Sequence, residues 1–345
     1  MAYEQRDPSD RGMSARPFFT VGVPTFDRAH SYLTHTLKAL LRQSFADFEL
    51  LVSDNASADD TEGVVRSLGD PRVRYVRRAE RMSPGAHFAA IAREARGRYF
   101  VLHQDDDLLH LEFLKRAHEA LCAHPEAVIY AAPIWRETPN RGYVARALRP
   151  REGYSDENLI ADRVYLIDGV HAAAKLFDSV LHFVHPAIAI NSDRLGEVSG
   201  YQSGSGYSVD LVTQALVLMR GPLVYDPRPG GIFRVHPGNY SRTMKRAVRK
   251  AFYRQTYVAL MEAFEQSGAD WQAALGVYLA TLQSEEIMEC VHQWLYYRAP
   301  VELQVLGMEC LARAWPGSTA GLYRKCLSRI GLRNLARHWL SRAGW

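Results

Sequence analysis

Three consecutive carboxylates follow an apolar run in the first third of the chain. They are Asp105-Asp106-Asp107, and the apolar run is residues 99–102. A short apolar run of this kind predicts a buried strand, so negative charge is concentrated at its C-terminal end. Adjacent carboxylates raise one another's pKa, and a hard divalent cation relieves that repulsion by taking their oxygens as ligands. The cluster therefore indicates a cation site, an exposed turn, or caps for a helix starting near Leu111.

Two earlier apolar runs also end in polar side chains. Pro24-Thr25-Phe26-Asp27-Arg28 follows the strand predicted at residues 18–23, and Ser53-Asp54-Asn55-Ala56-Ser57 follows the strand predicted at residues 48–52. Loops are polar for purely structural reasons, since they lie in water. However, ligands of open parallel sheets bind beyond the carboxyl ends of the strands. We therefore expect these two segments and residues 104–107 to form one shared site.

The elements that position these residues alternate between strand and helix. Further strands are predicted at residues 73–76, 99–103 and 127–130, with helices at about 31–41, 60–68, 85–95 and 111–123. This rhythm specifies βαβ units and a mixed, mainly parallel sheet covered by helices on both faces. The predicted fold class is therefore α/β and Rossmann-like.

The pattern changes after Tyr130. Residues 136–154 contain proline, glycine and many arginines and are interpreted as a loop; an apolar strand follows at 185–190, a helix at 209–219 and an apolar run at 223–225. From Thr243 onward the apolar residues recur with a helical period. We expect a flexible tail at 1–16, a catalytic domain at 17–242 and an α-helical region at 243–345.

Composition narrows the class of protein further. The 345 residues include 42 basic and 38 acidic side chains, a balance that gives no reason to expect nucleic acid as a partner. The four cysteines are scattered without metal-ligand spacing and are expected to be buried, reduced thiols. Neither a signal peptide nor a membrane-spanning run is recognisable, so a cytoplasmic location is expected. The oligomeric state cannot be predicted.

Together the three polar segments resemble the ordered landmarks of family 2 glycosyltransferases with the GT-A fold, over roughly residues 17–242. The resemblance implies transfer of a sugar from a nucleotide-diphosphate sugar, usually with inversion and with Mg or Mn. It also implies that Pro24, Thr25, and Asp27 or Arg28 flank the nucleotide base. Asp54 would then accept a hydrogen bond from the base edge.

The family's metal-binding DXD motif maps onto the triple carboxylate. Asp105 with Asp107, or Asp106 with Asp107, would contact the ribose and the cation, and Asp107 is the preferred metal ligand. The commonest form of the motif begins Leu-Asp, whereas Gln104 stands in that second position here. This departure shifts the assignment among the carboxylates without removing the cluster.

The resemblance also implies a general base near the start of a later helix. The family uses the Asp of a Glu-Asp pair about a hundred residues after the metal motif, and Asp210 fits that place, although Val209 stands where the glutamate is expected. The structural alternative is a first-turn carboxylate that the helix dipole favours. Asp193 and Glu197 are the other acids considered for this role.

A segment at residues 232–241 resembles the family's Tyr-Arg-x-His sequence. Arg234 would contact the donor diphosphate, and His236 would contact the diphosphate or the cation. His182, His185 and Asn191 would lie on the acceptor side, with a structural role favoured for His182. Residues 136–154 and 202–207 would shape the acceptor pocket.

The last part of the chain is basic and amphipathic. After Glu309 no acid occurs, while arginines and one lysine accumulate between Arg313 and Arg342 opposite an apolar face. Such a helix suits either an anionic membrane surface or packing on its own helical bundle or on a second subunit, and packing is slightly favoured.

The sequence therefore predicts an inverting, metal-dependent glycosyltransferase that uses a UDP or dTDP sugar. Its acceptor would be a saccharide, a lipid-linked molecule or a small molecule. One alternative is a catalytically silent scaffold with the same fold. A sugar nucleotidyltransferase is less favoured, because residues 22–27 do not form the glycine-rich basic loop that class requires.

Overall fold

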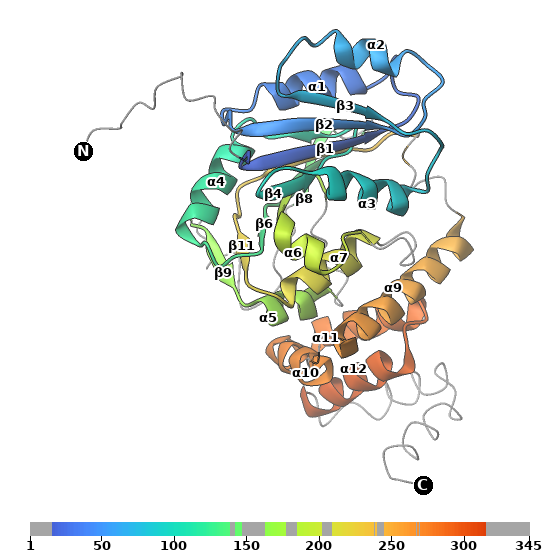
Figure 1. Cartoon of the computed structure of the whole chain (residues 1–345). Coiled ribbons are helices and arrows are strands. Elements are labelled where there is room, and N and C mark those ends of the chain that lie inside the picture. Colours follow the sequence, from blue (N-terminus) through green and yellow to red (C-terminus); the bar gives the residue numbers. More distant parts are fainter. Residues whose placement is uncertain are drawn as a thin grey trace, which may run out of the picture.

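An eight-stranded mixed sheet organises residues 19–225 of the chain (Figure 1). The computed structural model describes residues 16–138, 142–146, 163–176, 185–201, 209–237, 239, 245–266, 268 and 270–314. The strands of the sheet stand in the order β3-β2-β1-β4-β10-β6-β11-β9. Their bounds are β1 Phe19–Thr25, β2 Phe48–Asp54, β3 Val73–Arg77, β4 Tyr99–Leu102, β6 Ile129–Ala131, β9 Tyr165–Ile167, β10 Ile188–Asn191 and β11 Leu223–Tyr225.

Strands β1, β2, β3 and β4 run parallel, as the alternation of elements predicted. Every residue of β1 and β2 is buried, which is expected for strands of a parallel sheet with helices on both faces. Successive residues of β4 alternate between two cores: Phe100 and Leu102 face one, and Tyr99 and Val101 face the other. The parallel register brings the carboxyl ends of β1 and β2 together, since Thr25 pairs with Asp54.

Helices between the strands cover the sheet. They are α1 Leu33–Leu41, α2 Thr61–Arg66, α3 Pro84–Glu94, α4 Phe113–Ala123, α5 Gly169–Lys175, α6 Ser192–Glu197 and α7 Val209–Leu218. Helix α3 packs on β1 and β4, and α4 packs on β6. The strand and helix positions predicted for the first 130 residues are confirmed.

A second sheet was not predicted. It has the order β5-β12-β7-β8, with β5 Leu108–Leu109, β7 Ile134–Thr138, β8 Gly142–Arg146 and β12 Gly231–Arg234. The prediction of a loop at 136–154 is therefore wrong for its described part, where β7 and β8 form an antiparallel hairpin. Strand β12 pairs with β5, and this pairing carries the end of β12 to the chain that follows Asp107.

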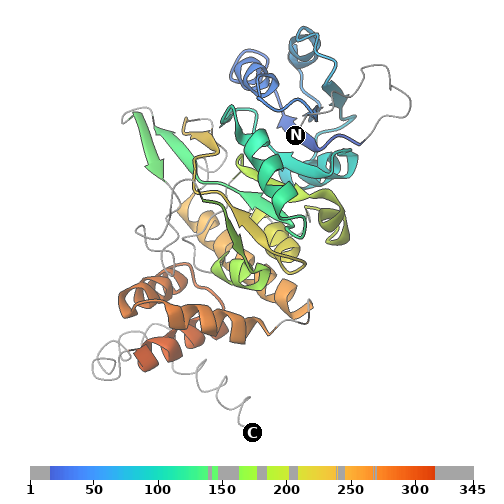
Figure 2. The same cartoon turned by 90° about the vertical axis from the view of Figure 1, so that its left-hand side faces the viewer.

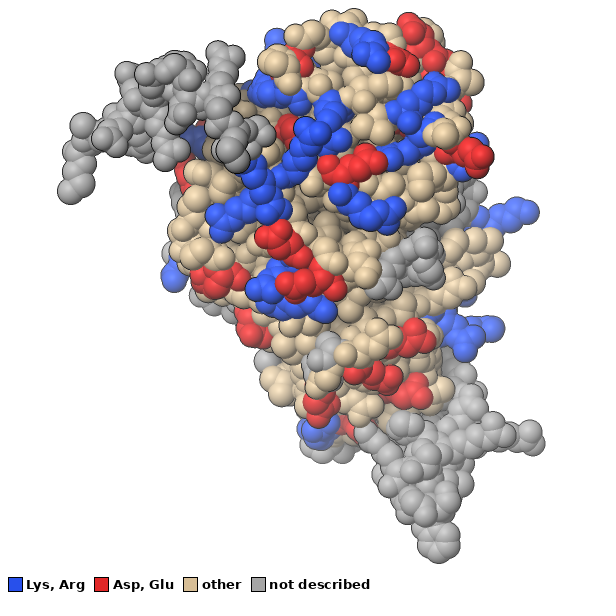
Figure 3. All heavy atoms as spheres, in the orientation of Figure 1, with Lys and Arg blue, Asp and Glu red and all other residues tan. Residues whose placement is uncertain are grey.

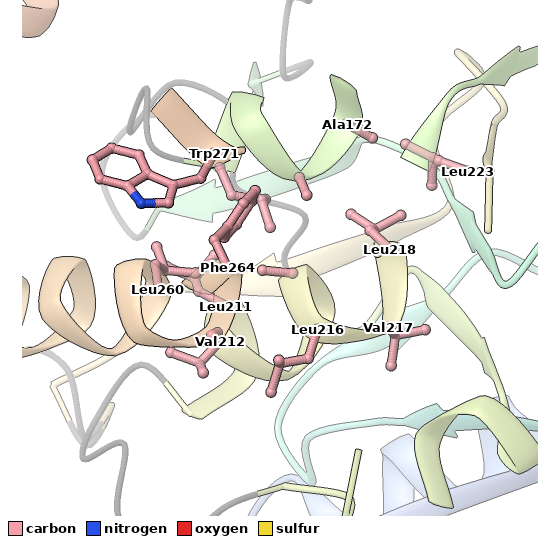
Figure 4. Close-up of a cluster of buried hydrophobic side chains, with 14 of the residues drawn as sticks. Ala172, Leu211, Val212, Leu216, Val217, Leu218, Leu223, Leu260, Phe264 and Trp271 are labelled. Carbon is pink, nitrogen blue, oxygen red and sulfur yellow. The ribbon is translucent and has the colours of Figure 1, made fainter. Parts of the chain in front are cut away.

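The C-terminal region, as far as it is described, contains the helices α9 Arg246–Gln266, α10 Trp271–Thr281, α11 Ser284–Tyr296 and α12 Val301–Ala314. Figures 1 and 2 place them below the sheet, beside α5 and α7. Helix α9 packs against α7, and α10 packs against α5. Leu260 and Phe264 of α9 belong to the same buried cluster as Leu211 and Val212 of α7 (Figure 4). The helical region thus shares its core with the catalytic half.

This shared core makes a prediction about stability. Phe264 is fully buried, so Phe264→Ala is expected to lower the free energy of unfolding of the whole protein by about 3–5 kcal/mol in denaturant titrations. Val277→Ala on α10 is the control, because Val277 is 65% exposed and its truncation should change stability by about 0.5 kcal/mol or less. A separate unfolding transition for the C-terminal helices, with the sheet unaffected, would contradict a shared core.

Surface charge and cysteine placement complete the description. On the face in Figure 3, basic and acidic side chains are interspersed over the N-terminal half, in keeping with ion pairs such as Arg74 with Glu49.

Cys290 and Cys310 are buried free thiols as expected, but Cys122 is exposed, because it lies on the outer side of α4. In the described part of the chain, no helix is both long and apolar enough to span a membrane. Residues 1–15, Cys326 and the basic segment after Ala314 lie outside the described residues.

Candidate active site

The triple carboxylate lies at the carboxyl edge of the main sheet, immediately after β4. Asp105 Oδ2 accepts a hydrogen bond of 2.8 Å from Thr25 Oγ1, at the end of β1. The Arg28 guanidinium lies 3.9 Å from the same oxygen. Burial and the neighbouring Asp106 raise the pKa of Asp105 to about 7. The first and third polar segments therefore meet, as predicted.

Asp107 joins this loop to the second sheet. Its Oδ1 accepts a hydrogen bond of 3.0 Å from the backbone N–H of Arg234, at the end of β12. Its Oδ2 is buried and has no hydrogen-bond partner in the described part of the chain. Burial, followed by the charge of Asp106, raises the pKa of Asp107 well above its ordinary value. A buried, unsatisfied carboxylate oxygen is costly and calls for a ligand.

Asp106 contacts the segment that follows β12. Its Oδ2 lies 2.8 Å from Nε2 of His236 and 3.4 Å from Nδ2 of Asn239. The Arg234 guanidinium donates to the Asp106 carbonyl at 3.2 Å and lies 5.1 Å from the centre of the Tyr32 ring. Arg234 and His236 are therefore part of the carboxylate site, although more than a hundred residues separate them from it.

Two structural explanations for the carboxylates are wrong. They do not form an exposed turn, because Asp106 is 9% and Asp107 0% exposed. They do not cap a helix either, because β5 follows them and α4 begins only at Phe113, with Glu112 at its N-cap.

The donor set fits a divalent cation bound together with a substrate. Asp105 and Asp107 carry hard oxygen atoms that could serve as ligands. Both carboxylates are buried, and both lie close to a third carboxylate, Asp106. Among the described residues, no group of three or more His, Cys, Asp and Glu side chains is arranged to hold a metal by itself. Magnesium in particular is commonly held by one or two carboxylates and completed by phosphate oxygens. The residues present fit that mode.

The loops after β1 and β2 are bound to each other. Asp27 has a left-handed backbone with φ of 50°, and its Oδ1 accepts a hydrogen bond of 2.7 Å from the Ala58 N–H. The Asp27 N–H donates to Ser57 Oγ at 2.9 Å. Ala56 is also left-handed, with φ of 62°. Strained residues of this kind persist where surrounding contacts hold them and cluster at ligand sites.

Asp54 is buried deeply beneath these loops. It is fully buried, and its oxygens accept hydrogen bonds from the Tyr75 hydroxyl at 2.6 Å and from the Ser57 N–H at 2.8 Å. Arg77 lies 3.7 Å away. Asp54 thus holds the second loop in shape, and its contact with a nucleotide base stays a prediction.

Asp210 lies in the first turn of α7, as expected. It is partly buried, and Oδ1 accepts a hydrogen bond of 3.0 Å from the Leu211 N–H. Burial raises its pKa to about 6. The glycines before it, with residues 202–208, lie outside the described residues. A carboxylate whose pKa is raised toward neutrality accepts a proton more readily than an ordinary aspartate does, which suits a general base.

The alternative acids are less suitable. Asp193 and Glu197 lie on α6, where their side chains are 68% and 46% exposed and pair with Arg16 and Arg194. Asn191, expected on the acceptor side, instead caps α6 by accepting hydrogen bonds from the Asp193 and Arg194 N–H groups. His182 lies outside the described residues.

A buried histidine pair beside the site was not fully predicted. Burial lowers the pKa of His103 to about 3 and that of His185 to about 4, so both rings are neutral. The Tyr201 hydroxyl lies 3.5 Å from Nε2 of His185. The position of His103 directly after an apolar run was a usable signal, whereas nothing in the sequence around Tyr201 marks it.

The architecture and the carboxylate edge together define the GT-A class of glycosyltransferase folds. Staphylococcus aureus TarS 1–349 in complex with UDP-GlcNAc superposes with a TM-score of 0.52 at 14% identity, covering 86% of this chain and 91% of that one. A mannosyltransferase from Pyrobaculum calidifontis, PcManGT, in complex with GDP-Man and Mn2+, superposes with a TM-score of 0.52 at 20% identity, covering 93% and 88%.

Sequence comparison then specifies the family. Residues 20–183 match the family described as glycosyl transferase family 2, which confirms the resemblance over that segment. A Campylobacter jejuni GalNAc(5)-diNAcBac-PP-undecaprenol beta-1,3-glucosyltransferase is 34% identical over 96 residues, which is 27% of this chain and 31% of that protein. A Streptomyces hygroscopicus validoxylamine A glucosyltransferase is 48% identical over 63 residues, 17% of this chain and 15% of that protein.

Both comparisons have defined limits. The chain aligns with less than a third of the length of these two curated relatives. Asp210, Arg234 and His236 lie beyond the segment that the family model matches. Their roles therefore depend on the geometry described above.

Proposed function

We propose that this protein is an inverting glycosyltransferase that moves a sugar from a nucleotide-diphosphate sugar, UDP or dTDP most favoured, to an acceptor hydroxyl. The observation that carries the proposal is the convergence of Thr25, Asp105, Asp107 and Arg234 at one edge of the sheet. A cluster of buried carboxylates beside arginines suits a donor diphosphate and its counter-ion.

The donor would lie over the ends of β1 and β2. Pro24, Thr25, Asp27 and Arg28 would flank the base and ribose, with Asp54 beneath them. The two bridged loops supply a preformed surface for this purpose, because Asp27 ties them together. Arg234 would contact the diphosphate, since its guanidinium already lies beside the Asp106 carbonyl.

Mg or Mn is the cofactor we propose, held by Asp107 and Asp105, with Asp106 and His236 beside it. Such a cation, when bound, neutralises charge that develops on a leaving diphosphate. Burial, followed by the charge of Asp106, raises the pKa values of Asp105 and Asp107, and a bound cation would relieve this unfavourable charge, which supports the assignment.

Asp210 would act as the general base. Its carboxylate would take the proton from the acceptor hydroxyl as the hydroxyl oxygen attacks the anomeric carbon, and the nucleoside diphosphate would leave from the opposite face. Its position at the start of α7, a helix buried on nearly every side, gives it a fixed support.

The acceptor class stays open between three chemistries: a saccharide, a lipid-linked molecule and a small molecule. One relative is named for an undecaprenol-linked saccharide and another for validoxylamine A, which supports a lipid-linked molecule and a small molecule as acceptor classes. A cytoplasmic location remains a prediction from the sequence.

The protonation of Asp210 predicts a pH dependence. Burial raises its pKa to about 6, and only the ionised carboxylate can accept a proton, so kcat/KM should fall about tenfold per pH unit below pH 6. Asp210→Glu should move this acid limb, because the new carboxyl group occupies a different environment. An acid limb that is unchanged in Asp210→Glu would assign the titration to another group.

A donor screen tests the function directly. The protein is incubated with UDP-, dTDP- and GDP-sugars and Mn2+, and release of the nucleoside diphosphate is followed with and without added saccharides and lipid-linked saccharides. We expect the nucleoside diphosphate to be released from the sugars of one nucleotide class, and the release to be faster when an acceptor is present. A protein that binds donors without releasing the diphosphate in any combination would favour the silent scaffold.

A further inference from the structure

Three buried side chains link the carboxylate loop to the start of α7, and none has a role in the reaction above. They are His103, His185 and Tyr201. Strand β10 runs antiparallel to β4, with Ile190 opposite Phe100, so the chain before β10 lies beside the chain after β4. His185 therefore lies next to His103 and the first carboxylates.

The hydrogen bonds of the two rings are incomplete. His103 Nδ1 lies 2.8 Å from the Gln104 carbonyl and must donate to it, which leaves Nε2 as an acceptor. Neither His103 Nε2 nor His185 Nδ1 has a hydrogen-bond partner of normal geometry in the described residues, although both rings are at least nine-tenths buried and the Leu102 backbone lies near enough to His185 to raise its pKa. Buried polar groups have hydrogen-bond partners in the large majority of cases. Two ring nitrogens without partners at one place therefore indicate a missing ligand or water.

Tyr201 extends this group toward the proposed base. Its ring is fully buried and packs edge-on against Phe88 and Phe100, which fixes the direction of the hydroxyl. The hydroxyl lies 3.5 Å from His185 Nε2, a separation at the outer limit of a hydrogen bond. Tyr201 belongs to the same buried cluster as Val209, the residue before Asp210, and the charge of Asp210 raises the pKa of Tyr201 after burial does.

The proposed reaction determines what must occupy this place. The donor diphosphate lies at the carboxylates and the acceptor hydroxyl at Asp210, so the transferred sugar must lie between them. Neutral imidazoles and a phenol hydroxyl donate and accept hydrogen bonds without charge, and sugar hydroxyls do the same. A cation would instead prefer the carboxylates nearby.

We infer that His103, His185 and Tyr201 bind hydroxyl groups of the transferred sugar and so determine which donor sugar is used. This inference rests on the proposed function. Sites built to hydrogen-bond a substrate hydroxyl reject analogues that lack it, because buried polar groups are then left unpaired. The nucleotide would be recognised elsewhere, at the loops after β1 and β2, and its diphosphate at the carboxylates and Arg234.

Calorimetric titration with sugar nucleotides and with the matching free nucleoside diphosphates separates recognition of the sugar from recognition of the nucleoside diphosphate. The pairs are UDP-glucose and UDP-GlcNAc with UDP, dTDP-glucose with dTDP, and GDP-mannose with GDP, each with Mn2+. Tyr201→Phe and His185→Gln are expected to weaken binding of the preferred sugar nucleotide by about 3- to 10-fold and to leave binding of its free diphosphate unchanged. Tyr201→Phe keeps the ring packing, so it decides the question if His185→Gln does not fold.

Tyr130→Phe is the matched control. Tyr130 is an equally buried tyrosine, and its hydroxyl donates to Asp226 at 2.7 Å, a carboxylate that has no role in the proposed site. Its loss should leave the ratio of the two affinities unchanged. If wild type binds donors but Tyr201→Phe and His185→Gln behave like Tyr130→Phe, the sugar-binding role is wrong. If wild type binds neither sugar nucleotides nor diphosphates, the proposed function itself fails.

Discussion

Asp210→Asn is expected to lower the turnover number by roughly 100- to 10,000-fold while donor affinity changes little. The amide keeps the size of the side chain and a carbonyl oxygen that can accept from the Leu211 N–H at the start of α7. It cannot take a proton from an acceptor hydroxyl. Initial-rate measurements with the preferred donor, together with calorimetric binding of that donor, separate the two quantities.

Asp193→Asn is the matched control for this experiment. Asp193 also lies in the first turn of a helix, but its side chain is 68% exposed and pairs with Arg16. Its replacement should leave the turnover number equal to that of the wild-type protein within experimental error. A turnover number for Asp210→Asn equal to that of the control would remove Asp210 from the chemistry and assign it the structural role of a helix-start carboxylate.

Asp107→Asn is expected to remove the dependence of donor binding on Mg or Mn. Loss of an outer-shell partner already weakens metal binding by about 10- to 100-fold, so loss of a direct ligand should cost at least that much. Asp107 is fully buried and its Oδ2 is unpaired, so its carboxylate charge is unfavourable without a cation. The neutral amide should therefore keep or raise the melting temperature of the metal-free protein.

These opposite effects make the experiment informative. Melting curves with and without Mn2+ and a nucleoside diphosphate would show wild type stabilised by the combination and Asp107→Asn unresponsive. Asp70→Asn, which removes an ion pair with Arg72 away from the site, should lower the melting temperature slightly and keep the response. A full Mn2+ response in Asp107→Asn would assign the metal to other ligands.

Much of the catalytic half was predictable because its strands are buried on both faces. Unbroken apolar runs such as residues 99–102 mark such strands, and polar residues mark where they end. The meeting of Thr25 with Asp105 then follows from parallel strand order. The contact of Asp106 with His236 was suggested only by resemblance, since no local pattern reports a contact between residues so far apart in the chain.

The error at residues 136–154 has a physical cause as well. Arginines, prolines and glycines make this segment resemble a loop, yet a small antiparallel sheet tolerates polar side chains on its exposed face, and β7 pairs with the edge strand β8 there. The boundary predicted near residue 242 follows a change of periodicity, which says nothing about packing, and it stays a prediction. Leu260 and Phe264 share one core with α7, so the helical region supports the helix that carries Asp210.

One measurement tests the central claim most directly: calorimetric titration of the wild-type protein with UDP, dTDP and GDP, first with Mn2+ or Mg2+ and then with a chelator. The account predicts that one diphosphate binds, with UDP or dTDP favoured, and that the chelator and Asp107→Asn each abolish or strongly weaken that binding. Binding of none of the three, with metal present and the protein folded, would contradict the donor site at the carboxyl edge of β1, β2 and β4.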